Sequence, residues 1–121
     1  MDLYIIYVNK GRKMSGKDRR EHHRVHLGEK VEFGVNDYQY KGVTYDLSPN
    51  GISIISEVSF PVGTRLNIRI HSEIAGSISV EGVVVWVNTL RNLPSKMGIK
   101  LTKSYPKLID IYRTMNKYKS S

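Results

Sequence analysis

The sequence predicts an all-β fold, a six-stranded antiparallel β-barrel, followed by a C-terminal α-helix. Short runs of alternating apolar and polar residues recur along the chain between turn signals, which is typical of small antiparallel barrels. The period changes near the C-terminus, where Leu108, Ile111, Tyr112 and Met115 recur at helical spacing. The chain has 121 residues, enough for one domain with a modest core.

Six segments are expected to form the barrel strands, because turn signals separate them and because residues 25–35 and 64–71 and the first half of 78–87 alternate at period two. They are residues 25–35, 38–47, 51–56, 64–71, 78–87 and 96–101. The first is expected to bend near Gly28. In the fifth, Val83, Val85 and Val87 make the far half apolar on both faces. That half is therefore expected to be covered on both sides, by the barrel interior and by a helix.

The helix is expected over residues 104–119. Ser104 can cap it and Pro106 suits its first turn. Its apolar stripe is expected to pack on the barrel, the alternative being a surface for a partner. The barrel with an N-terminal arginine loop takes residues 17–103. Residues 1–16 form an N-terminal extension, for which an extra strand and a flexible segment remain equal alternatives, so that an oligomer stays possible.

Composition narrows the class of protein. The chain has no cysteine, which excludes disulfides and thiolate metal sites and suits a reducing cytoplasm, the expected location. No apolar run approaches the ~20 residues that span a bilayer, so no membrane insertion is predicted. The net charge of +8 comes from the two ends, since residues 25–102 contain seven Lys/Arg and seven Asp/Glu. This neutral centre argues against a barrel that binds nucleic acid, whereas basic ends can attract a small dianion.

The turn Asp46-Leu47-Ser48-Pro49-Asn50-Gly51 joins the second and third predicted strands. Asp46 and Ser48 are two residues apart, so on an extended chain they point to the same face. Gly51 leaves room for a ligand to approach the backbone closely. The turn therefore offers a carboxylate and a hydroxyl beside a bare glycine. The alternative is that both side chains only bond their own backbone.

A basic segment precedes the first predicted strand and contains Arg19, Arg20 and Arg24. Guanidinium groups bind phosphate bidentately, read the O6/N7 edge of guanine and stack on bases. Alone, such a segment is more often a solvated tail. His22, His23 and His26 lie nearby, but no carboxylate or thiolate completes a recognisable pattern, so no metal site is predicted.

Arg20-x-x-x-Arg24 followed by Asp46-x-Ser48-x-x-Gly51 resembles the paired motifs of the PilZ domain, the bacterial receptor module for cyclic di-GMP. That family carries RxxxR in an N-terminal loop and (D/N)xSxxG on its barrel. The run Met97-Gly98-Ile99-Lys100-Leu101 is similar to the family's late-strand signature G-[IV]-x-[FL]. The resemblance covers roughly residues 17–101, and the two motifs in this order on a β-rich chain make it specific.

The resemblance implies a receptor or adaptor that binds cyclic di-GMP and signals by ordering its N-terminal loop. The implied ligand residues are Arg19, Arg20, Arg24, Asp46, Ser48 and Gly51, with Lys100 as a further candidate that is equally well read as an exposed strand lysine. An arginine directly before RxxxR resembles family members that bind an intercalated pair, so Arg19 implies two ligand molecules per domain. No other cofactor is implied, and the downstream protein partner is undefined.

Two other functions remain open. A degenerate barrel can act as an adaptor that binds only protein. A barrel of the OB or SH3-like kind can bind single-stranded nucleic acid, and Tyr38, Tyr40 and Tyr45 are available for stacking. The intact arginines oppose the first alternative and the neutral centre opposes the second. An enzyme is not expected, because Asp46 lacks a paired carboxylate or nucleophile and no histidine has an orienting partner.

Overall fold

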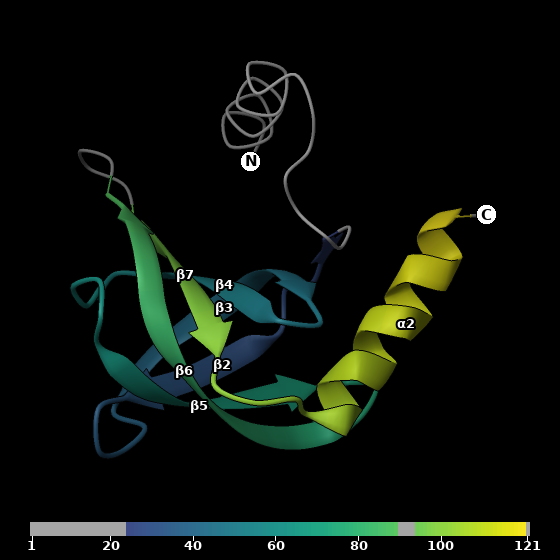
Figure 1. Ribbon diagram of the computed structural model, residues 1–121, viewed down its shortest axis with the longest axis horizontal. Helices are drawn as coiled ribbons and strands as arrows, with labels where there is room; N and C mark the ends of the chain where they lie inside the picture. Colours follow the sequence, from purple (N-terminus) through teal and green to yellow (C-terminus); the bar gives the residue numbers. More distant parts are fainter. Residues whose placement is uncertain (1–23, 90–93, 121) are drawn as a thin grey trace.

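The computed structural model describes residues 24–89 and 94–120, together with the side chains of these residues up to 117. They form a closed six-stranded antiparallel barrel with one short extra strand and a C-terminal helix on its side (Figure 1). The predicted fold class is thus confirmed. The elements are β1 (Val25–His26), β2 (Lys30–Gly34), β3 (Tyr40–Ser48), β4 (Gly51–Ser56), β5 (Arg65–Ser72), β6 (Gly76–Asn88), β7 (Ser95–Leu101) and α2 (Pro106–Ser120).

The barrel closes through strand β4. The strands follow the order β1-β3-β2-β5-β6-β7-β4, and β4 pairs a second time with β3. All pairings are antiparallel. Closure leaves few unpaired strand edges, and it brings the end of β3 next to β4 and β7. The region around the Asp46–Gly51 turn therefore lies on a continuous surface of several strands.

The first predicted strand is divided at the expected bend. Gly28 has a φ of 127°, which β-branched and bulky residues rarely adopt, and it separates β1 from β2. The backbone N–H groups of Gly28 and Glu29 donate to Thr44 Oγ1 at 3.1 and 2.8 Å. Both β1 and β2 pair with β3, so the break leaves the two pieces on the same partner strand.

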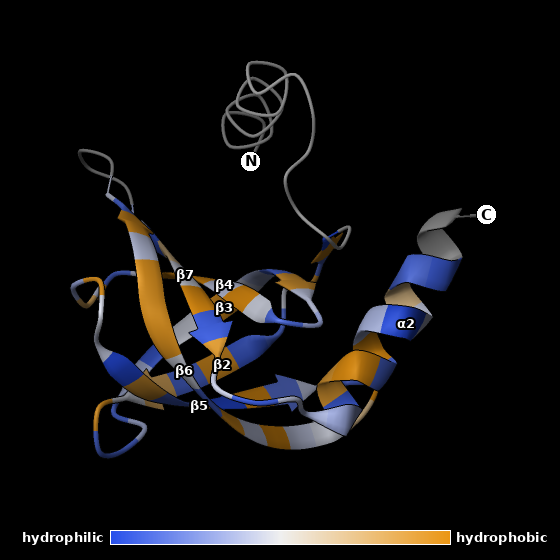
Figure 2. Cartoon of the chain, viewed as in Figure 1, coloured by the Kyte–Doolittle hydropathy of each residue, from blue (hydrophilic) through white to orange (hydrophobic). Residues whose placement is uncertain are grey.

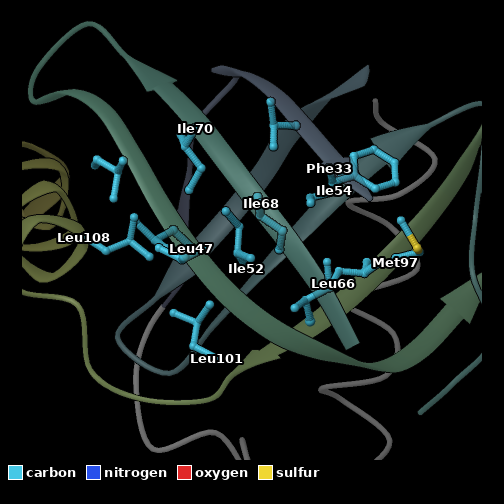
Figure 3. Close-up of a cluster of buried hydrophobic side chains, with 14 of the residues drawn as sticks. Phe33, Leu47, Ile52, Ile54, Leu66, Ile68, Ile70, Met97, Leu101 and Leu108 are labelled. Atoms are coloured by element: carbon cyan, nitrogen blue, oxygen red, sulfur yellow. The ribbon is translucent and has the colours of Figure 1, made fainter. Parts of the chain in front are cut away.

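The barrel interior is filled by aliphatic side chains with Phe33 at one end (Figure 3). They come from alternate positions of the strands, as the alternating hydropathy along the ribbon shows (Figure 2). Phe33 packs near Tyr40 and Phe60, with ring centroids 6.0 and 6.2 Å away. The buried apolar set is Val25, Val31, Phe33, Leu47, Ile52, Ile54, Leu66, Ile68, Ile70, Ile78, Val80, Val84, Met97, Ile99, Leu101, Leu108, Ile111 and Tyr112.

Two irregularities interrupt the alternation. The register of β3 shifts between Thr44 and Asp46, and that of β6 shifts between Val84 and Trp86. Each inserts one residue and exchanges the faces of the residues that follow. Trp86 therefore leaves the parity of Val84 and lies on the outer face.

The expectation that the far half of β6 is covered on both faces is wrong. Val85 and Trp86 are exposed, and helix α2 packs against β1 and β3 instead. The consecutive apolar residues at the end of β6 are explained by the shift of register. The shift turns Trp86 outward and places Val87 opposite Met97, a residue of the barrel core.

Helix α2 buries Leu108, Ile111 and Tyr112, three residues of the predicted stripe. The N-cap of this helix lies one residue later in the sequence than expected. The carbonyl of Tyr105 accepts from the N–H groups of Leu108 and Ile109, so Tyr105 rather than Ser104 occupies the N-cap position. No helix among the described residues is both long and apolar enough to cross a membrane.

Candidate ligand-binding face

The outer face of the barrel carries a row of residues that runs across five strands. The register places His26, Asp46, Ser53, Gly98 and Trp86 side by side, on β1, β3, β4, β7 and β6 respectively. The middle of this row has small residues and both ends have large ones. The side chains of Arg24 and Trp86 cover parts of this row, since Arg24 contacts Asp46 and the Trp86 ring lies against Gly98.

A second row lies next to the first. Ser48, Gly51, Lys100 and Val83 are paired across β3, β4, β7 and β6. The (D/N)xSxxG residues Asp46, Ser48 and Gly51 thus belong to two adjoining rows of one face. Lys100 pairs with Gly51 of this motif and its side chain is exposed, so both interpretations of Lys100, a ligand contact and an exposed strand lysine, remain open.

Arg24 binds both polar residues of the turn motif. Its Nη2 lies 3.0 Å from Asp46 Oδ1, and its Nη1 donates to Ser48 Oγ at 3.0 Å. Arg24 immediately precedes β1, and the pairing of β1 with the end of β3 brings the two segments together. Asp46 and Ser48 are each only 5% exposed, so this pair of contacts is sheltered from solvent.

Ser53 fixes the carboxylate of Asp46 from the other side. Its hydroxyl donates to Asp46 Oδ1 at 2.6 Å and accepts from the Asp46 N–H at 3.2 Å. Among the described residues, both contacts of the carboxylate thus use Oδ1. In the part of the chain that the structure describes, no hydrogen bond or ion pair uses the other oxygen, Oδ2.

Gly51 sits where a side chain does not fit. A Cβ at this position would lie 2.9 Å from the carbonyl oxygen of Ile99 and 3.9 Å from Arg24 Nη1. Any larger residue would have to displace backbone of β7, which is costly. The glycine of the motif is therefore required for the close pairing of β4 with β7.

The indole ring of Trp86 lies against Gly98. A Cβ at Gly98 would come within 2.0 Å of the indole Nε1, so only glycine allows this contact. Trp86 remains 39% exposed. One side of the ring thus rests on β7 while solvent reaches the residue, which is an arrangement suited to stacking a base.

Replacing Gly98 with alanine is expected to move the Trp86 ring off the strand, because the added methyl group and the indole cannot occupy the same space. Trp86 is the only tryptophan of the chain, so the intrinsic fluorescence emission should shift. Ser79→Ala, a change at an exposed position of β6, the strand that carries Trp86, serves as the control. Emission in Gly98→Ala that matches the wild type would contradict this packing.

Lys96 lies on the outward parity of β7 but is buried. Its ammonium is 3.7 Å from the centroid of the Tyr45 ring. Burial lowers the pKa of Lys96 to about 8, and the Asp46 carboxylate opposes this change. Burial, and then the charge of Asp46, raises the pKa of Tyr45.

The structure brings together Arg24, Asp46, Ser48, Gly51 and Lys100 among the residues that the sequence predicted. Arg19 and Arg20 lie outside the described residues. The sequence reasoning missed Ser53, Lys96, Gly98 and Trp86. Residues two apart on a strand share a face, so Ser53 could have been inferred from Gly51, and Gly98 and Lys96 from Lys100. No sequence signal indicated the register shift that turns Trp86 outward.

The chain is similar to one known protein family and to several solved structures. The family model described as PilZ domain matches residues 18–108. No curated protein matches the chain. Among solved structures, similar ones include the inhibitor of motility MotI/DgrA of Bacillus subtilis, at 23% identity and a TM-score of 0.65. It is matched over 83% of this chain and 53% of its own length.

Two further solved structures contain cyclic di-GMP. The PilZ domain of YcgR from Escherichia coli has a TM-score of 0.68 at 15% identity, with 84% of this chain and 94% of that chain covered. The PlzA protein of Borreliella burgdorferi has a TM-score of 0.58 at 14% identity, with 98% and 56% covered. This chain spans about half the length of MotI/DgrA and PlzA. At these sequence identities the similarity to solved structures shows only the fold. Membership of the family is shown by the family model, which matches residues 18–108. The chain belongs to the PilZ domain family.

Proposed function

We propose that this protein is a receptor for cyclic di-GMP and that the ligand lies on the outer face of β3, β4 and β7, between Arg24 and Trp86. The observation that carries the proposal is the Arg24–Asp46–Ser48 cluster at 3.0 Å, assembled from the two separated sequence motifs beside Gly51. Cyclic di-GMP complexes of the PilZ domain of YcgR and of PlzA support the same ligand class.

Each residue has a role that fits the chemistry of this ligand. A guanidinium has five N–H donors, and Arg24 uses two groups for Asp46 and Ser48, which leaves donors for a phosphate. Asp46 Oδ2 can accept from the N–H groups of guanine, a contact that a phosphate-binding residue cannot make. The indole of Trp86 offers a stacking face for a base, and Lys100 offers a charge beside Gly51.

Arg19 and Arg20 complete the proposed site from the N-terminal loop. The ligand carries two negative charges, and a stacked pair carries four phosphates, so a third arginine is useful. Each charge-assisted contact contributes about 1.5–3 kcal/mol. Ordering the loop costs about 1–2 kcal/mol per residue of backbone. Because these amounts nearly balance, loop order would follow ligand concentration, and the ordered loop would present a new surface to a partner protein.

Titration calorimetry of the wild type and Arg20→Ala tests the proposal. Heat release with a ligand-to-protein ratio near two, lost in the variant, is the expected result. A ratio near one would keep the receptor and retire the inference of an intercalated pair from Arg19. Absence of heat in the wild type would overturn the proposal and favour an adaptor that binds only protein. Turnover of cyclic di-GMP would also overturn it, since a receptor releases its ligand unchanged.

A further inference from the structure

Ser53 lies in the middle of the candidate ligand-binding face, and it belongs to neither of the two sequence motifs. It is part of β4, paired with Asp46 of β3 on one side and with Gly98 of β7 on the other. Ser53 is 1% exposed, although serine is mostly found on protein surfaces. A buried hydroxyl is tolerated only where it is hydrogen-bonded, so the partners of Ser53 indicate what it does.

The backbone partner of Ser53 lies at the irregularity in β3. The register of β3 against β4 shifts between Thr44 and Asp46, and Asp46 is the first residue paired after the shift. Such a shift interrupts the ladder of backbone hydrogen bonds between two strands. The N–H of Asp46 donates to Ser53 Oγ at 3.2 Å, so the hydroxyl provides an acceptor at the interrupted point. Ser53 thereby fixes the backbone of Asp46 relative to β4.

The side-chain partner of Ser53 is the Asp46 carboxylate. A hydroxyl has one proton, and Ser53 donates it to Asp46 Oδ1 at 2.6 Å, a length typical of a hydrogen bond to a charged oxygen. Arg24 Nη2 contacts the same oxygen at 3.0 Å. The torsion that turns an aspartate carboxylate is only weakly restricted on its own. Because Ser53 Oγ binds both the N–H and Oδ1 of one residue, it holds the carboxylate in one orientation.

We propose that Ser53 is a positioning residue for guanine recognition, which orients the Asp46 carboxylate so that the other oxygen, Oδ2, accepts from the N–H groups of the base. In the described part of the chain, no hydrogen bond or ion pair uses Oδ2. The guanidinium of Arg24 is shared with Ser48 and, in the proposed site, with a phosphate. Ser53 instead lies within a strand that is paired on both sides, so its place does not depend on the ligand. This inference deepens the proposed function and rests on it.

The test compares two ligands on the wild type and on Ser53→Ala by titration calorimetry. One ligand is cyclic di-GMP, and the other is its inosine analogue, which has the same phosphates but lacks the exocyclic amino group of guanine. The wild type should prefer cyclic di-GMP, because Asp46 Oδ2 accepts from that amino group. Ser53→Ala should bind cyclic di-GMP about tenfold more weakly, the size of one hydrogen bond to a charged group. It should lose less affinity for the inosine analogue, so that the preference for guanine shrinks.

Ser56→Ala is the matched control, since Ser56 is a second buried serine of β4. Its hydroxyl donates to the carbonyl of Lys41 on β3 at 2.8 Å and accepts from the N–H of Val58 at 3.1 Å. The two alanine variants therefore each remove one buried hydroxyl that links β4 to β3. Both should lower the midpoint of thermal unfolding, whereas Ser56→Ala should bind both ligands as the wild type does. A preferential loss of cyclic di-GMP binding in Ser56→Ala would overturn the proposal.

Ser53→Thr separates positioning from packing, because it keeps the hydroxyl and adds a methyl group. It should retain the wild-type preference for cyclic di-GMP over the inosine analogue, even where the added methyl group lowers the midpoint of thermal unfolding. Equal weakening of the two ligands in Ser53→Ala would indicate a merely structural serine and overturn the proposal, as would wild-type affinity in that variant. Failure of the wild type to bind either ligand would instead reject the receptor function on which the proposal rests.

Discussion

Replacing Arg24 with alanine is expected to weaken binding of cyclic di-GMP by at least about 100-fold. The guanidinium is the only described part of the RxxxR motif, and it links Asp46 and Ser48 at 3.0 Å each. In the proposed site the remaining N–H donors of Arg24 bind a phosphate, and losing two such charge-assisted contacts at about 1.5–3 kcal/mol each gives a factor of roughly 10² to 10⁴. The variant also leaves the Asp46 carboxylate, 5% exposed, without its guanidinium partner.

The matched control for this change is Arg113→Ala on helix α2, which removes an equal charge from an exposed position. Its affinity should remain within about twofold of the wild type, since surface charges act mainly through screened, long-range fields. Thermal unfolding of both variants shows whether the barrel is retained. An Arg24→Ala protein that is folded and binds nearly as well as the wild type would exclude the Arg24–Asp46–Ser48 cluster as the ligand site.

Replacing Phe33 with alanine is expected to lower the free energy of unfolding by about 3–5 kcal/mol, a typical cost for removing a buried aromatic ring. Phe33 is 0% exposed and packs near the rings of Tyr40 and Phe60. Because small domains are stable by only about 5–15 kcal/mol, this is a large share of the total. Urea denaturation followed by circular dichroism measures it.

Val62→Ala provides the comparison, since Val62 is 63% exposed in a loop. Its effect should stay within about 0.5 kcal/mol. If Phe33→Ala costs less than about 1 kcal/mol, the three aromatic rings do not form a tightly packed end of the core. Ligand binding by the remaining folded fraction of Phe33→Ala should be unchanged, because Phe33 points into the barrel (Figure 3) and the proposed binding face lies outside it.

Local sequence was sufficient for most of the architecture. Alternation at period two depends only on which residues neighbour each other along the chain, and it predicted the strands whose inward residues include Phe33, Ile52 and Ile68. The bend at Gly28 was also predictable, because glycine readily takes the positive φ that the break requires. The candidate site was found through its paired motifs, and Arg24, Asp46 and Ser48 are indeed in contact.

The composition of the proposed binding face depended on pairings between distant segments. Lys96 looks like an ordinary exposed strand lysine in the sequence, yet it is buried because the shifted register of β3 brings Tyr45 over it. Trp86 reads as a core residue by parity, yet the shift in β6 turns it outward onto Gly98. Alternation within one strand shows which residues share a face. Whether that face points into the barrel or outward after a bulge depends on the pairing with the neighbouring strand, and that pairing exists only in the closed barrel.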